Sequence, residues 1–239
     1  CQTSDPDIYA GGDCVMTTNL ISGQRVYAPM GSTANRQGRV IGNNITGGND
    51  THKGVLNTAV CKMFDWSLGA TGLSERVAKQ LGYDTVTCIV PGPDITHFMP
   101  GKKLIMTRLL ADRKTRKILG VQIVGPGKVD KRIDTMVAAL TFGATVDDLA
   151  NMDLSYAPPL SSAMENLTNA ANVMKNTIDG KAHDMRYEEF KSKLDSDDVV
   201  FVDLRTAHER AQKPVPAKHQ LHIPIEELRA RANEVPKDK

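Results

Sequence analysis

A carboxylate follows a short extended segment near the start of the chain. Asp7–Ala10 favours a β-strand, Gly11 and Gly12 interrupt it, and Asp13 comes next. A carboxylate at the carboxyl end of a strand lies where α/β folds bind ligands, and it accepts hydrogen bonds from sugar hydroxyls. The glycines let a ligand approach the backbone closely. Taken alone, the pattern fits a Gly-Asp turn without a ligand equally well.

A second candidate is Tyr156, which is followed by Ala157, Pro158 and Pro159. A phenol can donate a hydrogen bond to a thiolate or to a leaving group. The prolines after it would hold the ring in place at little entropic cost. The same residues also fit a buried tyrosine in a loop stiffened by proline. The segment alone therefore leaves a catalytic and a structural interpretation open.

Other reactive side chains have structural explanations. Thr206 and Glu209 have the T-x-x-E spacing of a helix capping box, and Asp203 and Arg205 are expected to order the loops beside them. His97 is expected to be a loop histidine rather than a catalyst. The four cysteines form no C-x-x-C pair and stand at no zinc-ligand spacing from a histidine. We therefore expect reduced, structural cysteines in a cytoplasmic protein, and no metal site.

Composition excludes several classes of protein. The 239 residues suggest one or two domains, and the net charge of +2 gives no reason to expect a nucleic-acid partner. Hydrophobic residues make up 40% of the chain, but no apolar run is long enough to cross a bilayer. The chain starts with Cys1 rather than Met, so we expect the natural N-terminus to lie upstream.

The elements that must position these residues fall into three parts. Residues 1–50 contain one expected helix, 32–45, and are too short to form a core of their own. The middle part is expected to have a mainly antiparallel sheet with segregated helices, an α+β domain. After a polar linker at 176–182, helices and strands are expected to alternate as in an α/β fold. The expected elements are strands at 58–64, 85–90, 103–111, 118–124 and 199–203, and helices at 74–81, 130–142, 161–174, 187–194 and 225–232.

The segment that ends at Asp13 resembles the second flavin motif of the flavoproteins with two dinucleotide-binding domains, T-x-x-x-x-I-Y-A-x-G-D. In that family the aspartate binds the ribityl chain of FAD. The resemblance implies cofactor binding by the matching residues, which are Thr3, Ile8, Tyr9, Ala10, Gly12 and Asp13.

Residues 29–39 are similar to a string that opens a helix under the flavin in the coenzyme A-disulfide reductase and NADH oxidase branch of the pyridine nucleotide-disulfide oxidoreductases. Amides at such a helix start favour the electron-rich edge of a reduced flavin. The resemblance places Met30 and Gly31 at the flavin and Asn35 on the substrate side, whereas Arg36 and Arg39 fit solvated helix positions.

In the same branch, the tyrosine that corresponds to Tyr156 reaches the active site of the partner subunit, which implies a homodimer. This chain departs from the branch at two places. His97–Gly101 stands where a Y-Y-P-G string is common, and Met164 stands where a basic residue contacts the coenzyme A phosphate. The resemblance therefore leaves a disulfide, a persulfide, a polysulfide and oxygen open as electron acceptors. The H-P-x-x-x-E motif of glutathione- and lipoamide-type reductases is not matched.

Residues 200–209 and His222-Ile223-Pro224 are similar to the D-x-R-x-x-x-E and H-I-P motifs of rhodanese-like domains. In rhodaneses the nucleophilic cysteine follows the next strand, and this sequence contains no such cysteine. The segment alone is therefore expected not to transfer sulfur.

Together the resemblances imply three parts: the C-terminal tail of an α/β FAD-binding domain at 1–50, a dimerisation domain at 51–176, and the start of an α/β rhodanese-like domain at 183–239. The intact protein is expected to be an FAD-dependent NAD(P)H oxidoreductase that reduces a small sulfur-containing substrate, and a coenzyme A-derived compound is one candidate. No G-x-G-x-x-G phosphate loop occurs here, so the NAD(P)H domain and redox cysteine are expected upstream, and the isolated chain is expected to be inactive. The alternatives are an NADH oxidase or peroxidase acting on oxygen species, and a non-catalytic dimerisation module.

Overall fold

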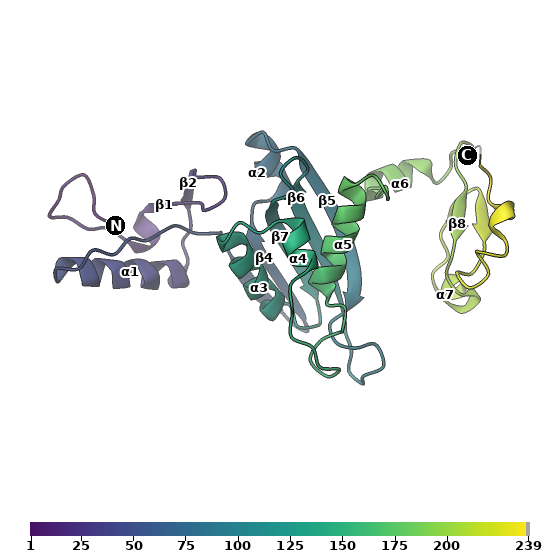
Figure 1. The fold of residues 1–239 in the computed structure, drawn as a ribbon, viewed down its shortest axis with the longest axis horizontal. Helices are drawn as coiled ribbons and strands as arrows, with labels where there is room; N and C mark the ends of the chain where they lie inside the picture. The colour runs from purple at the N-terminus through teal and green to yellow at the C-terminus, as the bar shows by residue number, and fades with distance from the viewer. Residues whose placement is uncertain (238–239) are drawn as a thin grey trace. The chain divides into compact units, whose positions relative to one another are not determined.

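The computed structural model describes residues 1–237. The chain separates into two compact units, Cys1–Ala182 and a second one that begins at His183. The first unit carries an N-terminal segment and a central α+β domain, and the second is small (Figure 1).

The N-terminal segment consists of one long helix, a short hairpin and loops. A 3-10 turn, η1 (Gly12–Cys14), precedes the antiparallel pair β1 (Met16–Thr18) and β2 (Arg25–Tyr27), and α1 spans Gly31–Ile45. The helix expected at 32–45 is thus confirmed. The strand expected at 7–10 is wrong, because only an isolated bridge between Gln2 and Tyr9 forms there and no neighbouring strand extends it.

The central domain is built on a five-stranded sheet in which every neighbouring pair is antiparallel, as expected. The strands lie in the order β3-β4-β7-β6-β5. The sequence did not predict β4, because its composition, WSLGATG, lacks the alternation of a half-buried strand. The bounds are β3 (Ala59–Met63), β4 (Trp66–Gly72), β5 (Thr85–Pro93), β6 (Leu104–Asp112) and β7 (Ile118–Gly125).

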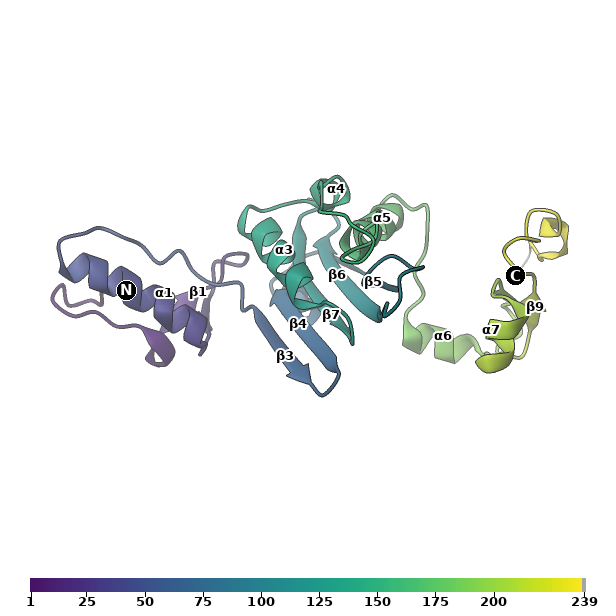
Figure 2. The same ribbon diagram turned by 90° about the horizontal axis from the view of Figure 1, so that it is seen from below.

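Helices cover one face of this sheet (Figure 2). These are α3 (Asp130–Thr141), α4 (Val146–Ala150) and α5 (Asn166–Ile178), while α2 (Glu75–Gln80) follows β4. The helix expected at 161–174 begins five residues later, because the carboxylate of Glu165 caps α5 by accepting a hydrogen bond from the Leu167 amide at 2.7 Å. The core between sheet and helices includes Ile105, Leu109, Ile123, Ile133, Met136, Leu167 and Met174, all at most 2% exposed.

On the opposite face of the sheet, α2 packs against Leu110 at one end, and the rest of the face is largely apolar. A shallow groove of about 530 Å³ runs over it and is lined by side chains that include Leu68, Ile89, Met106 and Val124. Gly69 explains how α3 comes so close on the helix side, since a Cβ there would lie 2.4 Å from Cγ1 of Ile133.

The second unit contains a parallel strand pair joined through a helix. Strands β8 (Phe201–Asp203) and β9 (Gln220–His222) are parallel, α7 (Ala207–Gln212) lies between them in sequence, and α6 (Tyr187–Lys193) precedes them. The helix expected at 225–232 is wrong. Leu228 and Arg231 each donate to a carbonyl four residues back, but these two bonds are not consecutive, and Glu227 and Ala230 donate only three residues back. The segment therefore forms successive turns before the 3-10 turn η2 (Ala232–Glu234).

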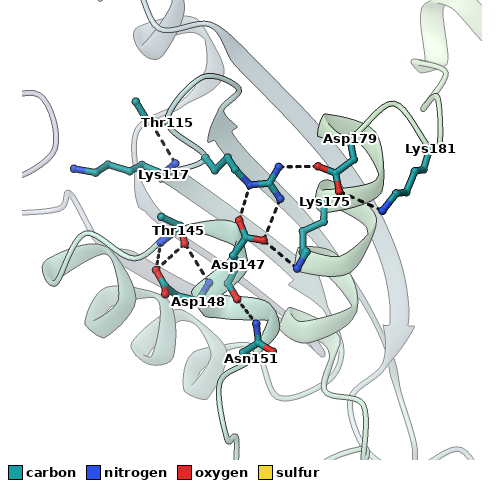
Figure 3. A network of polar contacts seen from close by, with 10 residues as sticks. Thr115, Lys117, Thr145, Asp147, Asp148, Asn151, Lys175, Asp179 and Lys181 are labelled. Carbon is teal, nitrogen blue, oxygen red and sulfur yellow. Dashed lines mark hydrogen bonds and ion pairs between the residues drawn. The ribbon is translucent and has the colours of Figure 1, made fainter.

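A network of charges joins the β6–β7 turn to the helices at one end of the central domain. Arg116 contacts Asp147 at 2.5 Å and Asp179 at 2.8 Å, and Lys175 contacts Asp147 at 3.0 Å. Figure 3 shows Asp147 between α5 and the residues of the turn, with Lys175 beside it and Asp179 at the end of α5. Hydrogen bonds from Arg116 and Lys175 hold the pKa of Asp147 at about 2, below its ordinary 3.8.

This network predicts a pH-dependent contribution to stability. A carboxyl whose pKa is depressed in the folded state stabilises the fold above its unfolded pKa of about 3.8 and loses that contribution as the pH falls towards about 2. Asp147→Asn should therefore lower the melting temperature at pH 7 by an amount that shrinks below pH 4. The effect should be modest, about 1 kcal/mol or less, because the pair is partly exposed to solvent. Thermal unfolding of the chain at several pH values checks this, with Asp153→Asn as the control, and an Asp147→Asn effect independent of pH would contradict it.

Candidate functional site

The turn that carries Asp13 is fixed on α1. The Gly12 amide donates to Oε1 of Gln37 at 2.7 Å, and Gly12 has a φ of +81°, in the region that favours glycine. Gly11 packs so closely that a Cβ there would lie 2.9 Å from Cδ1 of Ile41. Asp13 itself is exposed, and its carboxylate forms no hydrogen bond or ion pair within residues 1–237. The turn therefore holds an unpaired carboxylate next to α1.

The other residues of the same motif shape the loop that precedes this turn. The Thr3 amide donates to the Ile8 carbonyl at 2.9 Å, and the Ala10 amide donates to the Cys1 carbonyl at 2.9 Å. Tyr9 pairs with Gln2 in the isolated bridge. Thr3 also uses its hydroxyl within the loop, since Oγ1 donates to the Asp5 carbonyl. These residues thus close a loop whose end presents Asp13.

The start of α1 lies open. Thr33 and Ala34 both donate to the Met30 carbonyl, and no side chain caps the helix, so the amides of Gly31 and Ser32 have no partner among the described residues. Apart from its two neighbours in the chain and the backbone of the helix itself, no described residue has an atom within 4 Å of the position that a Gly31 Cβ would take. An uncapped helix start with room above it is suited to an electron-rich group.

Asn35 lies on the first turns of the same helix. Its Nδ2 donates to the Gly31 carbonyl at 2.7 Å, and its side chain is exposed. Beside it, a cavity of about 210 Å³ lies between the start of α1 and α3, lined by Met30, Thr33 and Arg36 on one side and by Asp134 on the other. Asp13, Gly31 and Asn35 are therefore carried by η1 and the first turns of one helix.

Tyr156 lines a different cavity, of about 400 Å³, at the end of the central domain. Its side chain is 52% exposed. His97 and Phe98, from the loop between β5 and β6, and Met164, from the loop before α5, line the same cavity. The His97 and Phe98 rings meet edge to face with centroids 5.3 Å apart. Besides these residues, the lining comprises Pro93, Thr96, Ser162, Ala163, Asn166 and Asn169, so no carboxylate, lysine or arginine takes part.

His97, Phe98 and Met164 stand where this sequence departs from the expected motifs. The structure places all three around one cavity together with Tyr156. Asp13 and Gly31 do not line the cavity that contains Tyr156. The resemblance assigned Tyr156 to a partner's site, so this separation within one chain agrees with that expectation without testing it.

The sequence analysis missed three buried charged residues under the Tyr156 loop, Asp94, Arg132 and Glu165, which are 1–4% exposed. A signal for Arg132 was present. It follows Val129 by three positions and precedes Met136 by four, so it falls on the apolar face of α3.

In the second unit, the residues of the rhodanese-like motifs form hydrogen bonds and ion pairs that hold the neighbouring loops in place. Arg205 binds the Asp203 carboxylate through two nitrogens at 2.9 and 2.7 Å, which keeps the pKa of that carboxyl well below its usual range, and it also donates to the Lys213 carbonyl. The His222 ring contacts the Arg205 carbonyl at 2.8 Å. Thr206 and Glu209 form both halves of the expected capping box. Asp203 and Arg205 therefore order the loops around them, as expected.

Within residues 1–237, no helix is long and apolar enough to cross a membrane, and no three His, Cys, Asp or Glu side chains gather as a metal site would require. None of the four cysteines forms a disulfide within the described residues.

Residues 58–168 match the family model described as the pyridine nucleotide-disulphide oxidoreductase dimerisation domain. Among curated proteins, the chain is 40% identical over 174 residues to an NAD(P)H coenzyme A polysulfide/persulfide reductase of Pyrococcus horikoshii, covering 73% of this chain and 39% of that protein. It is also 39% identical over 170 residues to an NADH oxidase of Methanocaldococcus jannaschii, covering 71% of this chain and 38% of that protein.

Among solved structures, an NAD-dependent persulfide reductase from A. fulgidus matches 100% of this chain with a TM-score of 0.92 and 44% identity, over 42% of its own length. The reduced CoADR-RHD of Bacillus anthracis matches 100% of this chain with a TM-score of 0.88 and 33% identity, again over 42% of its length. The chain thus spans about two fifths of these relatives.

Proposed function

We propose that this chain, whose residues 58–168 form a pyridine nucleotide-disulphide oxidoreductase dimerisation domain, is part of an FAD-dependent enzyme that uses NAD(P)H to reduce a disulfide, a persulfide or a polysulfide. One observation carries the proposal: Tyr156 lies on a loop, is half exposed and lines a cavity. Relatives named for persulfide, polysulfide and coenzyme A disulfide substrates support the sulfur chemistry.

The N-terminal segment fits one edge of an FAD site. Asp13 has an unpaired carboxylate that can accept hydrogen bonds from the ribityl hydroxyls, and the free amides at the start of α1 suit the electron-rich edge of the ring. Gly31 leaves room for the ring, Met30 lines the adjoining cavity, and Asn35, whose Nδ2 donates to the Gly31 carbonyl, would lie on the substrate side. The bound flavin would carry electrons from the nicotinamide to the sulfur centre, while these residues bind and orient it.

Tyr156 is assigned to the sulfur step. Its hydroxyl donates a hydrogen bond to the sulfur that leaves as a thiolate, which stabilises the developing negative charge. The family places this tyrosine in the partner's active site, so we propose a homodimer in which the Tyr156 loop of each subunit completes the other site.

The proposal extends to the organisation of the whole polypeptide. Residues 1–50 are the tail of an α/β FAD-binding domain, 51–176 the dimerisation domain and 183–239 the start of a rhodanese-like domain. The parallel β8–α7–β9 unit and the Asp203–Arg205 pair support the last assignment. We propose a cytoplasmic location, where cysteines stay reduced, and the four cysteines form no disulfide within the described residues.

The second candidate function is an oxidase or peroxidase that uses NADH and acts on oxygen species. The similarity to the Methanocaldococcus NADH oxidase favours it. A third possibility, for the isolated chain, is a dimerisation module without cofactor or turnover.

A turnover assay distinguishes these candidates. It uses the full-length polypeptide that contains this chain, which we call the complete protein. With NADH or NADPH and a persulfide, it should oxidise one nicotinamide and release one thiol and one sulfide for each persulfide reduced, and with a disulfide it should release two thiols for each nicotinamide oxidised. Oxygen should support a much slower reaction. Rapid oxygen consumption together with inert sulfur substrates would favour the oxidase, and a colourless protein without turnover would favour the module.

The FAD site also predicts a difference between the isolated chain and the complete protein. Asp13 and the start of α1 supply one edge of the site, so the isolated chain should bind FAD weakly or not at all, whereas the complete protein should be yellow. Flavin absorbance after gel filtration measures both. Stoichiometric FAD that stays with the isolated chain would show that the described residues suffice, against this expectation.

A further inference from the structure

Three charged side chains are buried beneath the loop that carries Tyr156. Arg132 is 1% exposed, and Glu165 and Asp94 are both 4% exposed. Charges are rarely buried unless they are paired, because removal from water costs several kcal/mol per ion. Each of them comes from a different segment: Arg132 from α3, Glu165 from the end of the Tyr156 loop and Asp94 from the residues after β5.

Arg132 joins these three segments at one point. Its Nη2 pairs with the Glu165 carboxylate and donates to the Asp94 carbonyl at 2.8 Å, and its Nη1 donates to the Lys128 carbonyl at 2.5 Å. The planar guanidinium is suited to this, because it offers several donors in fixed directions.

The Asp94 carboxylate then fixes the loops on either side. It accepts hydrogen bonds from the Lys103 amide at 2.8 Å and the Lys128 amide at 3.2 Å. Gly127 makes room for it, since a Cβ there would lie 2.7 Å from the Asp94 Cβ. The loop between β5 and β6, which supplies His97 and Phe98 to the cavity, is thereby tied to the start of α3.

The residues around Tyr156 are held through their carbonyls. The Ser155 carbonyl accepts from Oγ of Ser161 at 2.7 Å, and the Pro158 carbonyl accepts from the Thr96 amide at 3.2 Å. The Pro159 carbonyl accepts from Nζ of Lys128 at 3.2 Å. Tyr156 therefore lies on a loop whose backbone is bonded on both sides of the ring, while its own side chain remains half exposed.

We infer that Arg132, with Glu165 and Asp94, is a positioning group that sets the place of the Tyr156 ring for the sulfur step. This inference rests on the proposed function. Net stability is a weak reason for such a pair, because well-packed apolar residues often stabilise a core as well as a buried ion pair does. Orientation is the stronger reason, because the guanidinium ties together the three segments that set the loop around Tyr156.

Arg132 and Glu165 can be neutralised together so that neither is left as a buried charge without its partner, while the Asp94 carboxylate keeps its hydrogen bonds from the Lys103 and Lys128 amides. In the double variant Arg132→Met with Glu165→Gln, both charges disappear, and the glutamine oxygen can still accept from the Leu167 amide and cap α5. Arg132→Lys is a second variant that keeps the charge and loses the planar fork. The matched control is Arg116→Met with Asp147→Asn, which removes an ion pair elsewhere in the same domain.

The primary measurement is the ¹⁹F NMR spectrum of the complete, FAD-loaded protein with 3-fluorotyrosine in place of Tyr156. A probe in place of Tyr83, whose hydroxyl contacts the Ile21 carbonyl, reports on the rest of the first unit. The inference predicts one narrow resonance at position 156 that broadens or splits in the double variant and in Arg132→Lys. The Tyr83 probe and the control variant should show no change. This readout does not depend on the substrate or on turnover.

The kinetic measurement is the oxidation of the reduced enzyme by a persulfide. The double variant should slow this step by about tenfold or more, because small misplacements of a reacting group are costly, and flavin reduction by NAD(P)H should be spared. In a Tyr156→Phe background the double variant should cause no further loss. A position-156 resonance that stays narrow, or a further loss in that background, would overturn the inference. If the variants alter the position-156 resonance but even the wild type does not react with a persulfide, the proposed function is contradicted. The role of Arg132 in placing the Tyr156 ring would then still stand.

Discussion

Tyr156→Phe in the complete protein should slow the reaction of the reduced enzyme with its sulfur substrate by about tenfold or more. The substitution removes the hydroxyl that we propose donates a hydrogen bond in the transition state, and the ring remains in the cavity it shares with Phe98 and Met164. Folding should change little, because the side chain is half exposed and its hydroxyl forms no hydrogen bond within residues 1–237.

Stopped-flow absorbance separates the two half-reactions of this variant. Flavin reduction by NAD(P)H and the FAD content should match those of the wild type, and only the sulfur step should slow. Tyr187→Phe is a suitable control, since that tyrosine is 70% exposed on α6. Equal rates in the sulfur step for Tyr156→Phe and the wild type would remove Tyr156 from the mechanism and leave the structural interpretation of the Tyr-Ala-Pro-Pro segment.

Asp13→Ala should weaken FAD binding by the complete protein by about 10- to 150-fold. Hydrogen bonds to a charged group contribute about 1.5–3 kcal/mol, and each 1.4 kcal/mol corresponds to tenfold in affinity. The turn itself should survive, because Gln37 holds it through the Gly12 amide rather than through the carboxylate.

Titration of the apoprotein with FAD, followed by the quenching of flavin fluorescence, measures this loss. Asp7→Ala is the matched control, because Asp7 lies in the preceding loop and is also exposed. Wild-type affinity in Asp13→Ala, or an equal loss in Asp7→Ala, would show that the motif carboxylate does not bind the cofactor. Neither result would bear on Tyr156.

The regular elements were predictable where local pattern decides the structure. The apolar spacing of α3 and the alternation in β6 predicted both elements to within one or two residues. The strand β4 was missed because its glycine and small residues give no periodic signal, although Gly69 is required there for the close approach of α3. Asp7–Ala10 has strand-like residues, but no adjacent strand within the described chain supplies hydrogen bonds to extend it.

The sequence selected individual candidate residues for the site but not their arrangement. Motif spacing selected Asp13 and Tyr156, because a flavin site and a catalytic phenol each need particular residue types. The cavity that Tyr156 shares with His97 and Met164 depends on how the β5–β6 loop meets the loop before α5, which no local pattern encodes. The Arg132–Glu165 pair was hidden for the same reason, since its partners lie on different elements.

The most direct test of a sulfur-reducing enzyme is a single turnover of the complete protein without oxygen. The flavin is first reduced with one equivalent of NADH or NADPH and is then mixed with a persulfide in one experiment and with oxygen in another. The account predicts that the persulfide reoxidises the enzyme rapidly, with release of sulfide, and that oxygen does so far more slowly. Rapid reoxidation by oxygen with no reaction of the persulfide would contradict it and identify an oxidase.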